Sequence, residues 1–375
     1  LHINHHVYPK MVTTAAQAWS ELGKTDFLRH ILVLEAVKEG FQDNLPTLMI
    51  KMQPWTEAEL AEVRTYFHPV VEMVVHPLEP EKNMLSEEFF SGTLAQQTID
   101  QVSYRVAAST DDRPYFNFLR KSFTELAADP SQFLNFSTAS LLNSQLKNGW
   151  IATDVIHLVV TGGASLFFIV MFVFVPMYFS RAGREKWQGK VASLIYFSCL
   201  GAGFIIFELV FIQIFMKLIG YPLYTYSTIV FAMLISAGFG SAMSGKMHVS
   251  PQQRWFVPFI GVLTFSVLIV VGYEAYFELF MQLPTIARVI AATILIFPLG
   301  FFLGMPFPLG ILAIAQQPRG SIAWAWAMNG LFTVVGGLGS VLLSIYLGFR
   351  LTVIVAILIY VVAFLMFNRL RQSVV

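Results

Sequence analysis

The chain has 375 residues, of which 56% are hydrophobic and 13% are charged, and its formal net charge is +1. This balance, with a mean hydropathy of +0.63, lies outside the range of ordinary soluble domains and predicts a membrane protein. Nucleic acid is not an expected partner, because the basic residues of the apolar part lie at loops and form no polar face. The single cysteine, Cys199, excludes a disulfide or a cysteine-based metal site within one chain.

The charges divide the chain near residue 152. Lys and Arg are shared evenly by the two parts, whereas the only acidic residues beyond that point are Asp154, Glu185, Glu208, Glu274 and Glu278. Such asymmetry indicates two regions in different solvents. We therefore expect a polar α/β domain over residues 1–152 and a multi-pass transmembrane helical domain over residues 153–375.

The polar part begins with a predicted short helix over 14–22, which Thr14 caps and Gly23 ends. Three apolar runs of buried-strand length follow, over 30–35, 46–51 and 69–75. Thr56 and Glu59 between the second and third runs form a capping box, with Trp55 and Leu60 placed for a hydrophobic staple. Strand, helix and strand at this spacing predict βαβ units, a mostly parallel sheet and a partial Rossmann-like, methyltransferase-type fold.

No glycine-rich strand-to-helix turn, of the kind that cradles a nucleotide-like cofactor, occurs in residues 1–152. The glycines there are isolated at Gly23, Gly40, Gly92 and Gly149. Three strands would also leave an unprotected sheet edge. We therefore expect the chain, which opens on Leu1, to be the C-terminal piece of a larger membrane protein whose cofactor-binding half lies upstream.

Two polar clusters in this part suggest binding sites, but each can also be explained without one. Asp111 and Asp112 form a carboxylate pair that suits a polyamine ammonium, but a turn in which Arg113 neutralises one of them explains the same residues. His2, His5 and His6 suggest a metal, yet no cysteine or nearby carboxylate completes a ligand shell, so no metal site is expected.

The apolar part contains runs long enough to cross about 30 Å of hydrocarbon, which takes about 20 helical residues. We expect seven spans: 153–179, 191–216, 224–244, 255–273, 285–312, 323–346 and 351–368. Prolines interrupt the fifth, which should kink or break near Gly304. Small residues at helix-packing spacing are Gly300 and Gly304, Gly238 and Ala242, and the stripe Asn329, Thr333, Gly336 and Ser340.

Basic residues gather in alternate loops of the apolar part. Arg181, Arg184, Lys186 and Lys190 follow the first span, and Arg369 and Arg371 follow the last. By the positive-inside rule this puts the C-terminus in the cytoplasm and residues 1–152 outside. A cofactor-using domain is expected in the cytosol, so the sequence leaves the sidedness open.

Glu208 is the residue of the apolar part to which we assign most weight. It is a carboxylate in the middle of an apolar span, which is costly and by default a functional hypothesis. It shares a helix face with Gly201, and Gln213, Asn329, Trp324 and Trp326 are candidates to line a cation site with it. The equally weighted alternative is a protonated Glu208 that bonds to Asn329 or Gln213 between helices. Arg288 can snorkel to the interface and needs no functional explanation.

Five short motifs in order carry a family resemblance. They are His6-Val-Tyr-Pro-Lys-Met-Val-Thr-Thr-Ala, Asp111-Asp-Arg-Pro-Tyr-Phe, Glu208 with Gln213 and Gly220-Tyr-Pro, Gly304-Met-Pro-Phe-Pro-Leu-Gly, and Trp324-Ala-Trp-Ala-Met-Asn-Gly. Together they make nearly the whole chain resemble the C-terminal part of bacterial spermidine synthase-like integral membrane proteins. In that family a Rossmann-type aminopropyltransferase or methyltransferase-like domain is joined to membrane helices.

The resemblance implies a bacterial inner-membrane transferase that uses S-adenosylmethionine or its decarboxylated form and acts on a polyamine or another small substrate. The family's cofactor-binding and catalytic residues precede the region that corresponds to Leu1, so none is transferred to this chain, and the piece alone is expected to be inactive. The rival hypothesis is a transporter or channel with a regulatory or degenerate α/β domain, favoured by Glu208 and the broken fifth span. A seven-helix receptor fits only the span count and the charge bias.

Overall fold

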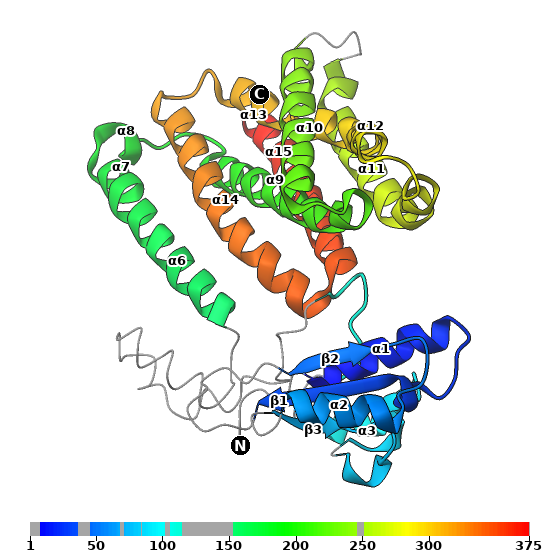
Figure 1. Cartoon of the computed structure of the whole chain (residues 1–375). Helices are drawn as coiled ribbons and strands as arrows, with labels where there is room; N and C mark the ends of the chain where they lie inside the picture. The colour runs from blue at the N-terminus through cyan, green and yellow to red at the C-terminus, as the bar shows by residue number, and fades with distance from the viewer. Residues whose placement is uncertain are drawn as a thin grey trace. The chain divides into compact units, whose positions relative to one another are not determined.

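The computed structural model describes residues 8–36, 46–67, 71–83, 85–101, 106–114, 153–245 and 251–374 (Figure 1). The chain divides into two compact units, Leu1–His157 and Leu158–Val375. The first is a small mixed unit and the second consists of long apolar helices. Each is described by itself.

The N-terminal unit contains a three-stranded antiparallel sheet in the order β2-β1-β3. Among its described residues the strands are β1 (Ile31–Ala36), β2 (Thr47–Ile50) and β3 (Val71–Val75), and the α-helices are α1 (Tyr8–Glu21), α2 (Glu57–Phe67) and α3 (Gln96–Gln101). Ile31 of β1 pairs with Ile50, and Ala36 pairs with Val71. The predicted parallel sheet is therefore wrong, and a Rossmann-like fold is not shown.

The position of β1 explains this error. Strands β2 and β3 run in the same direction and are joined by α2, as a βαβ unit requires, but β1 lies between them and runs the opposite way. Ile31 and Val33 pack in one apolar cluster with α1, while Leu32 and Leu34 pack in a second cluster with Leu60 of α2. Because both faces of β1 are covered, its sequence is apolar throughout, like that of a parallel strand.

Two helix ends in this unit show how local chemistry sets the boundaries. Helix α1 begins at Tyr8, six residues before the predicted Thr14, with Pro9 in its first turn. It ends as predicted at Gly23, which has φ +70°, and the amide of Lys24 donates to the carbonyl of Trp19 over 3.2 Å. This is the Schellman arrangement, which favours glycine because its left-handed position has no room for a side chain without strain.

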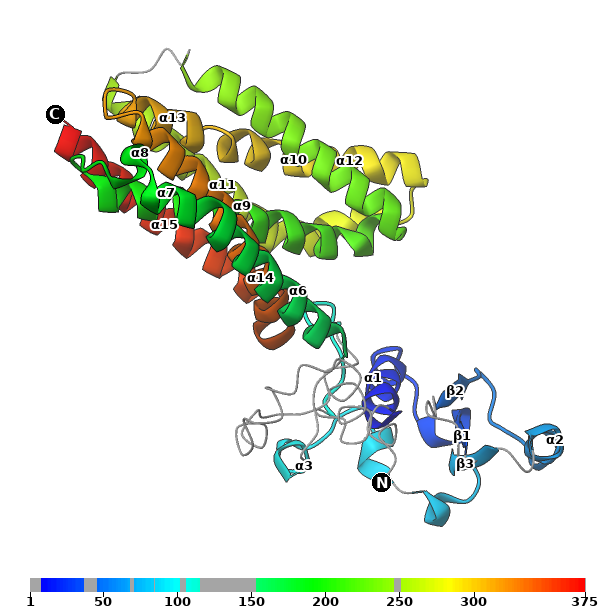
Figure 2. The same ribbon diagram turned by 90° about the vertical axis from the view of Figure 1, so that its left-hand side faces the viewer.

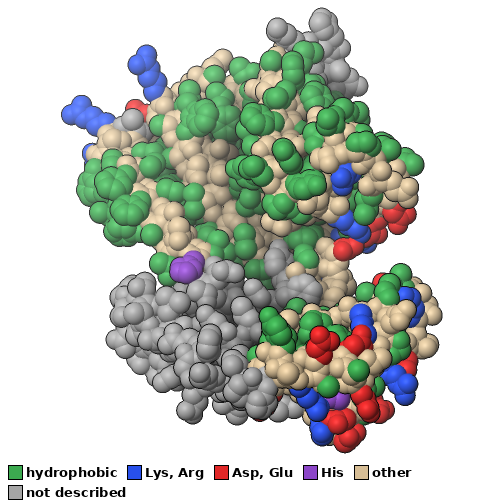
Figure 3. All heavy atoms as spheres, viewed as in Figure 1, with side chains coloured by type: hydrophobic (Ala, Val, Ile, Leu, Met, Phe, Trp, Pro, Cys, Tyr) green, Lys and Arg blue, Asp and Glu red, His purple; other side chains and the backbone are tan. Residues whose placement is uncertain are grey.

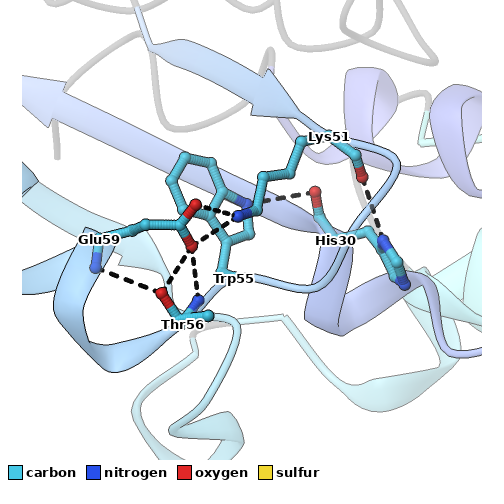
Figure 4. Close-up of polar contacts among 5 residues, drawn as sticks. All are labelled: His30, Lys51, Trp55, Thr56 and Glu59. Carbon is cyan, nitrogen blue, oxygen red and sulfur yellow. Dashed lines mark hydrogen bonds and ion pairs between the residues drawn. The ribbon is translucent and has the colours of Figure 1, made fainter.

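The predicted capping box begins α2 (Figure 4). The backbone amide of Thr56 donates to Glu59 Oε2 over 2.8 Å, and the amide of Glu59 lies 3.4 Å from Thr56 Oγ1. Lys51 forms an ion pair with Glu59, and Trp55 Nε1 donates to the carbonyl of His30 over 3.2 Å. These contacts, led by the hydrogen bond from Lys51, lower the pKa of Glu59 to about 2. Trp55 and Leu60 lie in one apolar cluster, as the staple predicts.

The described residues from His157 onward contain seven helices that are long and apolar enough to cross a membrane, as the sequence predicted, and the protein is a multi-pass membrane protein. The spans are His157–Phe179, Lys190–Ile219, Pro222–Ser244, Trp255–Phe280, Thr285–Ile314, Gly320–Leu347 and Phe349–Gln372. Hydrophobic side chains are spread over the visible face of these helices, and the charged side chains lie near its edges (Figure 3). Such an apolar exterior matches a lipid environment.

The second span is the central helix. It is α9 (Lys190–Ile219), which packs chiefly against α14 (Gly320–Leu347) and α15 (Phe349–Val374), and these three helices run side by side in Figures 1 and 2. It also contacts α10 (Pro222–Ser244) and α11 (Pro251–Phe280). Among the seven spans α9 is the most buried.

Two spans are irregular at prolines. The first consists of α6 (Thr153–Ile169), a π-helical turn Val170–Phe174 and α7 (Val175–Phe179), and Pro176 is the second residue after the π turn. The fifth breaks as predicted into α12 (Thr285–Leu303) and α13 (Pro306–Ile314), on either side of Gly304 and Met305. A four-residue helix, α8 (Arg181–Arg184), follows α7.

Close helix contacts confirm most of the small-residue predictions. A Cβ added at Gly300 or Gly304 would meet Ser236 or Ala237 of α10, and one added at Gly336 would meet Ala202 of α9 at 2.7 Å. The predicted Gly238 contact is wrong, because Gly238 faces open space. Gly240 takes that role instead and lies against the backbone of Phe301.

Candidate functional site

One motif of the family resemblance contacts the segment that leads into another in the N-terminal unit. Thr13 Oγ1 donates to the carbonyl of Val106 over 2.6 Å, and the backbone amide of Ser109 donates to Thr14 Oγ1 over 2.9 Å. The two threonines belong to the first motif, and residues 106–109 directly precede the Asp111 motif. Helix α1 therefore holds the chain that leads into Asp111, although more than 90 residues separate them.

A cavity of about 420 Å³ lies beside this junction. Its walls come from α1, the 3₁₀ helix Glu87–Phe90, the residues around the start of α3, and Ala107 and Ala108. Gly92, with φ +84°, allows the chain to pass close to α1, since a Cβ there would meet Ser20 at 2.6 Å. A side chain at position 92 would push the chain away from α1 and change this wall of the cavity.

The cavity combines carboxylates with an apolar wall. Glu21 and Glu88 line it, and each accepts one hydrogen bond: Gln17 Nε2 donates to Glu21 over 2.9 Å and Thr98 Oγ1 donates to Glu88 over 2.6 Å. Apolar lining is supplied by Phe89, Leu94, Ile99, Ala107 and Ala108. Carboxylates beside methyl and aromatic groups complement a ligand that alternates ammonium groups with methylene chains.

Asp111 and Asp112 lie in a tight turn from Thr110 to Arg113, which form an isolated β-bridge, and the amide of Arg113 donates to the carbonyl of Thr110 over 2.9 Å. The turn that the sequence suggested is thus present. It begins two residues after Ala108, which lines the cavity. The two aspartates therefore follow the cavity wall directly in the chain.

A second group of ionisable residues was not singled out from the sequence. Glu35 of β1 is 3% exposed, Tyr8 is 2% exposed and Lys10 is 7% exposed. Burial, with a smaller contribution from the Glu35 carboxylate, raises the pKa of Tyr8 to about 12. The signal in the sequence was a single glutamate at the end of an otherwise apolar strand, since buried carboxylates are rare.

Glu208 lies half-buried on α9, about 16 Å from the helix's C-terminal end, which is near the middle of a hydrocarbon core of about 30 Å. Within the described residues it has no hydrogen bond or ion pair. The expected partners are elsewhere: Gln213 is exposed, and Asn329 Nδ2 donates to the carbonyl of Phe197 over 3.3 Å. Phe197 is three helical turns from Glu208, so the hydrogen bond expected between Glu208 and Asn329 is absent from this part of the chain.

The two tryptophans expected near Glu208 also lie apart from it. Trp324 Nε1 donates to the carbonyl of Gly183 over 2.9 Å, and the Trp326 ring lies 4.7 Å from that of Phe307 in α13. The predicted close approach at Gly201 is present, because a Cβ there would meet the backbone of Asn329. On the face of α9 that Gly201 and Glu208 share, Gly201 therefore packs against α14, and the carboxylate of Glu208 lies two turns further along the helix.

The break in the fifth span lies at a different depth from Glu208. The Tyr196 hydroxyl donates to the carbonyl of Pro306 over 2.5 Å, and the rings of Phe197 and Phe307 lie 5.3 Å apart. Tyr196 is about 9 Å from the start of α9 and about 18 Å before Glu208 along the helix. The two features on which the transporter hypothesis rested are thus separated in the bundle.

The remaining candidates from the sequence are the N-terminal histidines and Arg288. His2, His5 and His6 lie outside the described residues, and the described part contains no group of three metal-ligating side chains. Arg288 does more than snorkel, because its Nη1 donates to the carbonyl of Leu218 over 3.0 Å and so satisfies the last turn of α9.

Comparison of the chain with known proteins identifies no related protein. No family model, no curated protein and no solved structure matches this chain. Function must therefore be argued from the residues themselves.

Proposed function

We propose that this chain carries the membrane anchor and the amine-binding part of a spermidine synthase-like transferase in the bacterial inner membrane. The whole protein would move an aminopropyl or methyl group from decarboxylated S-adenosylmethionine or S-adenosylmethionine to an amine. The observation that supports this most is the junction of Thr13 and Thr14, in the first motif, with residues 106–109, which directly precede the Asp111 motif and in part line one cavity.

The chemistry of the cavity suits the acceptor. A polyamine is cationic at neutral pH, and Glu21 and Glu88 supply negative charge while Phe89 and Leu94 contact its methylenes. The amine must lose a proton before it attacks a sulfonium carbon, so a carboxylate close to the nitrogen would both orient it and receive that proton. Thr98 holds one oxygen of Glu88 and Gln17 holds one oxygen of Glu21, so each carboxylate has a fixed position from which to orient the amine.

The described residues do not fit the sulfonium donor. In the N-terminal unit the described glycines with positive φ are Gly23, which ends α1, and Gly92, which lies against Ser20. Neither forms a phosphate- or adenosine-cradling turn between a strand and a helix. The proposal therefore assigns donor binding to residues outside the described part of the chain.

The test is calorimetric titration of the natively expressed, full-length protein with spermidine. We expect Glu88→Gln to weaken spermidine binding about tenfold, because a charge-assisted contact is lost while the hydrogen bond to Thr98 is kept. Glu57→Gln removes an exposed carboxylate of α2 and is the matched control. Equal binding by all three proteins would exclude the cavity as the amine site.

Transfer itself is a separate measurement. Label from the S-adenosyl donor should appear on the amine with the full-length protein, and Glu88→Gln should raise KM for the amine. If the protein binds spermidine but yields no labelled product from either donor, the proposed amine site stands and the proposed transferase activity is rejected.

One observation favours a second candidate function, cation transport by the bundle. Glu208 is a half-buried carboxylate near the middle of the central helix with no partner among the described residues. Under this proposal Glu208→Gln abolishes cation flux in proteoliposomes and leaves spermidine binding at the N-terminal unit intact. Unchanged flux in that variant would reject transport.

A further inference from the structure

The connection between the first and second spans is built around the carbonyl of Gly183. Trp324 Nε1 donates to this oxygen over 2.9 Å, and Lys190 Nζ lies 3.5 Å from it. The hydroxyl of Ser180 accepts a hydrogen bond from the amide of Gly183 over 2.9 Å and so caps α8. A Cβ at position 183 would collide with the carbonyl of Met177, so the turn closes only with glycine. The corner is thereby fixed to the start of α14 and the start of α9.

Lys190 is part of this framework. Its ammonium lies 4.4 Å from the centre of the Trp187 ring and 5.0 Å from that of Trp324, and it donates to the carbonyl of Glu185 over 3.2 Å. Two indoles and two carbonyls surround the charge. Lys190 therefore holds the corner together and is not available to an external anion.

Three other cations lie at the surface of the corner, one of which, Arg184, also donates from Nη2 to the carbonyl of Phe179 over 3.4 Å. Arg181, Arg184 and Lys186 are exposed, and Glu185 is the one carboxylate among residues 180–190, all of which the structure describes. Lys and Arg side chains project from the bundle at the end where α8 lies (Figure 3). Because the scaffold beneath them is fixed, the three charges stay concentrated within one short turn and add their fields.

The same corner marks the edge of the hydrocarbon. Tyr178 and Phe179, the last residues of the first span, are 67% and 71% exposed. Exposed aromatic rings that directly precede a basic turn are typical of the headgroup level of a bilayer. A ligand at this corner thus meets cations on one side and an apolar surface on the other.

We propose that this corner, residues 178–190 with Trp324, is a binding site for the headgroup of an anionic phospholipid such as phosphatidylglycerol. The two guanidinium groups match the phosphodiester, and the rings of Tyr178 and Phe179 contact the upper acyl chains. A free phosphate lacks the apolar part that these rings require. An exposed ion pair strengthens binding by at most about fivefold, so the three basic side chains together contribute up to about 100-fold.

The experiment is native mass spectrometry of the whole protein in detergent, titrated with phosphatidylglycerol or phosphatidylcholine. Wild type should bind phosphatidylglycerol in preference, and the triple variant Arg181→Gln, Arg184→Gln, Lys186→Gln should bind it up to about 100-fold more weakly, with phosphatidylcholine unchanged. The matched control removes the same charge from the N-terminal unit through Lys24→Gln, Arg29→Gln and Lys82→Gln, and should bind both lipids like wild type.

Three results would overturn the proposal. Wild type that shows no preference between the two lipids has no anionic headgroup site. A triple variant that binds phosphatidylglycerol like wild type places that site elsewhere. Inorganic phosphate that displaces phosphatidylglycerol at equal concentration shows that the acyl chains contribute nothing. Equal melting temperatures of wild type and both variants confirm that loss of binding is not loss of fold.

Discussion

The contact between α9 and α14 gives a quantitative test of the bundle through Gly336→Ala. A Cβ at this position would lie 2.7 Å from Ala202 Cα and 2.8 Å from its carbonyl oxygen, whereas ordinary contacts begin near 3.4 Å. Both atoms are backbone, so they cannot rotate away, and the helices must separate by about 0.7 Å. Overpacking of this kind costs about 1–3 kcal/mol.

The control is the same substitution on the same helix. Gly330 has no atom within 4 Å of an added Cβ, so Gly330→Ala meets no clash and gains up to about 1 kcal/mol from the helix propensity of alanine. Because both substitutions gain the same helix propensity, equilibrium unfolding in mixed micelles with increasing sodium dodecyl sulfate should separate the two variants by the clash alone, about 1–3 kcal/mol. Equal stability of the two would refute the close approach of α9 and α14 on which the description of the bundle rests.

Three further predictions concern single residues. Burial lowers the pKa of His76 below its ordinary value of 6.5, so the folded N-terminal unit favours the neutral ring. The stability that this preference gives the unit is lost as the pH falls below about 6.5. Hydrogen exchange of the whole protein should show this loss, and His76→Gln should abolish it. Thr56→Ala removes the cap of α2 and should cost about 1 kcal/mol, seen as faster amide exchange over 57–60. Tyr196→Phe deletes the hydrogen bond to Pro306 and should lower the free energy of unfolding in micelles by about 1 kcal/mol, with an unchanged value counting against that contact.

Features set by short stretches of sequence were predictable. The capping box needs only Thr56 and Glu59, the end of α1 needs only Gly23, and a membrane span needs only its own apolar length. The break near Gly304 follows for the same reason, because Pro306 lacks the amide donor that would continue the helix across Gly304 and Met305. Each of these was recognised with nearly correct boundaries.

Features that depend on pairing between distant segments could not be predicted from the sequence. The apolar sequence of β1 records that both its faces are covered, but not which strands flank it or in which direction they run. Thr14 was expected to cap a helix, yet it lies inside α1, where its hydroxyl donates to the carbonyl of Lys10 and accepts from Ser109. The cavity escaped notice because Glu21 and Glu88 are far apart in the chain and unremarkable by themselves.

The orientation of membrane helices was the third difficulty. Glu208 and Asn329 were expected to meet because each is polar and each lies inside an apolar helix. A helix that is apolar on nearly every side carries little periodicity to show which face meets which neighbour. Asn329 in fact meets α9 at Phe197, so the polar atoms alone did not identify the contact.

The central place of α9 also bears on how the bundle is made. Membrane helices enter the bilayer in chain order and associate afterwards. Helix α9 is the second span, but its main partners α14 and α15 belong to the sixth and seventh. Until those arrive, the surface that α9 finally buries, including Gly201, faces lipid. The contact between Asn329 and Phe197 is then one of the last to form, and assembly of this bundle is a closing step made after synthesis is nearly complete.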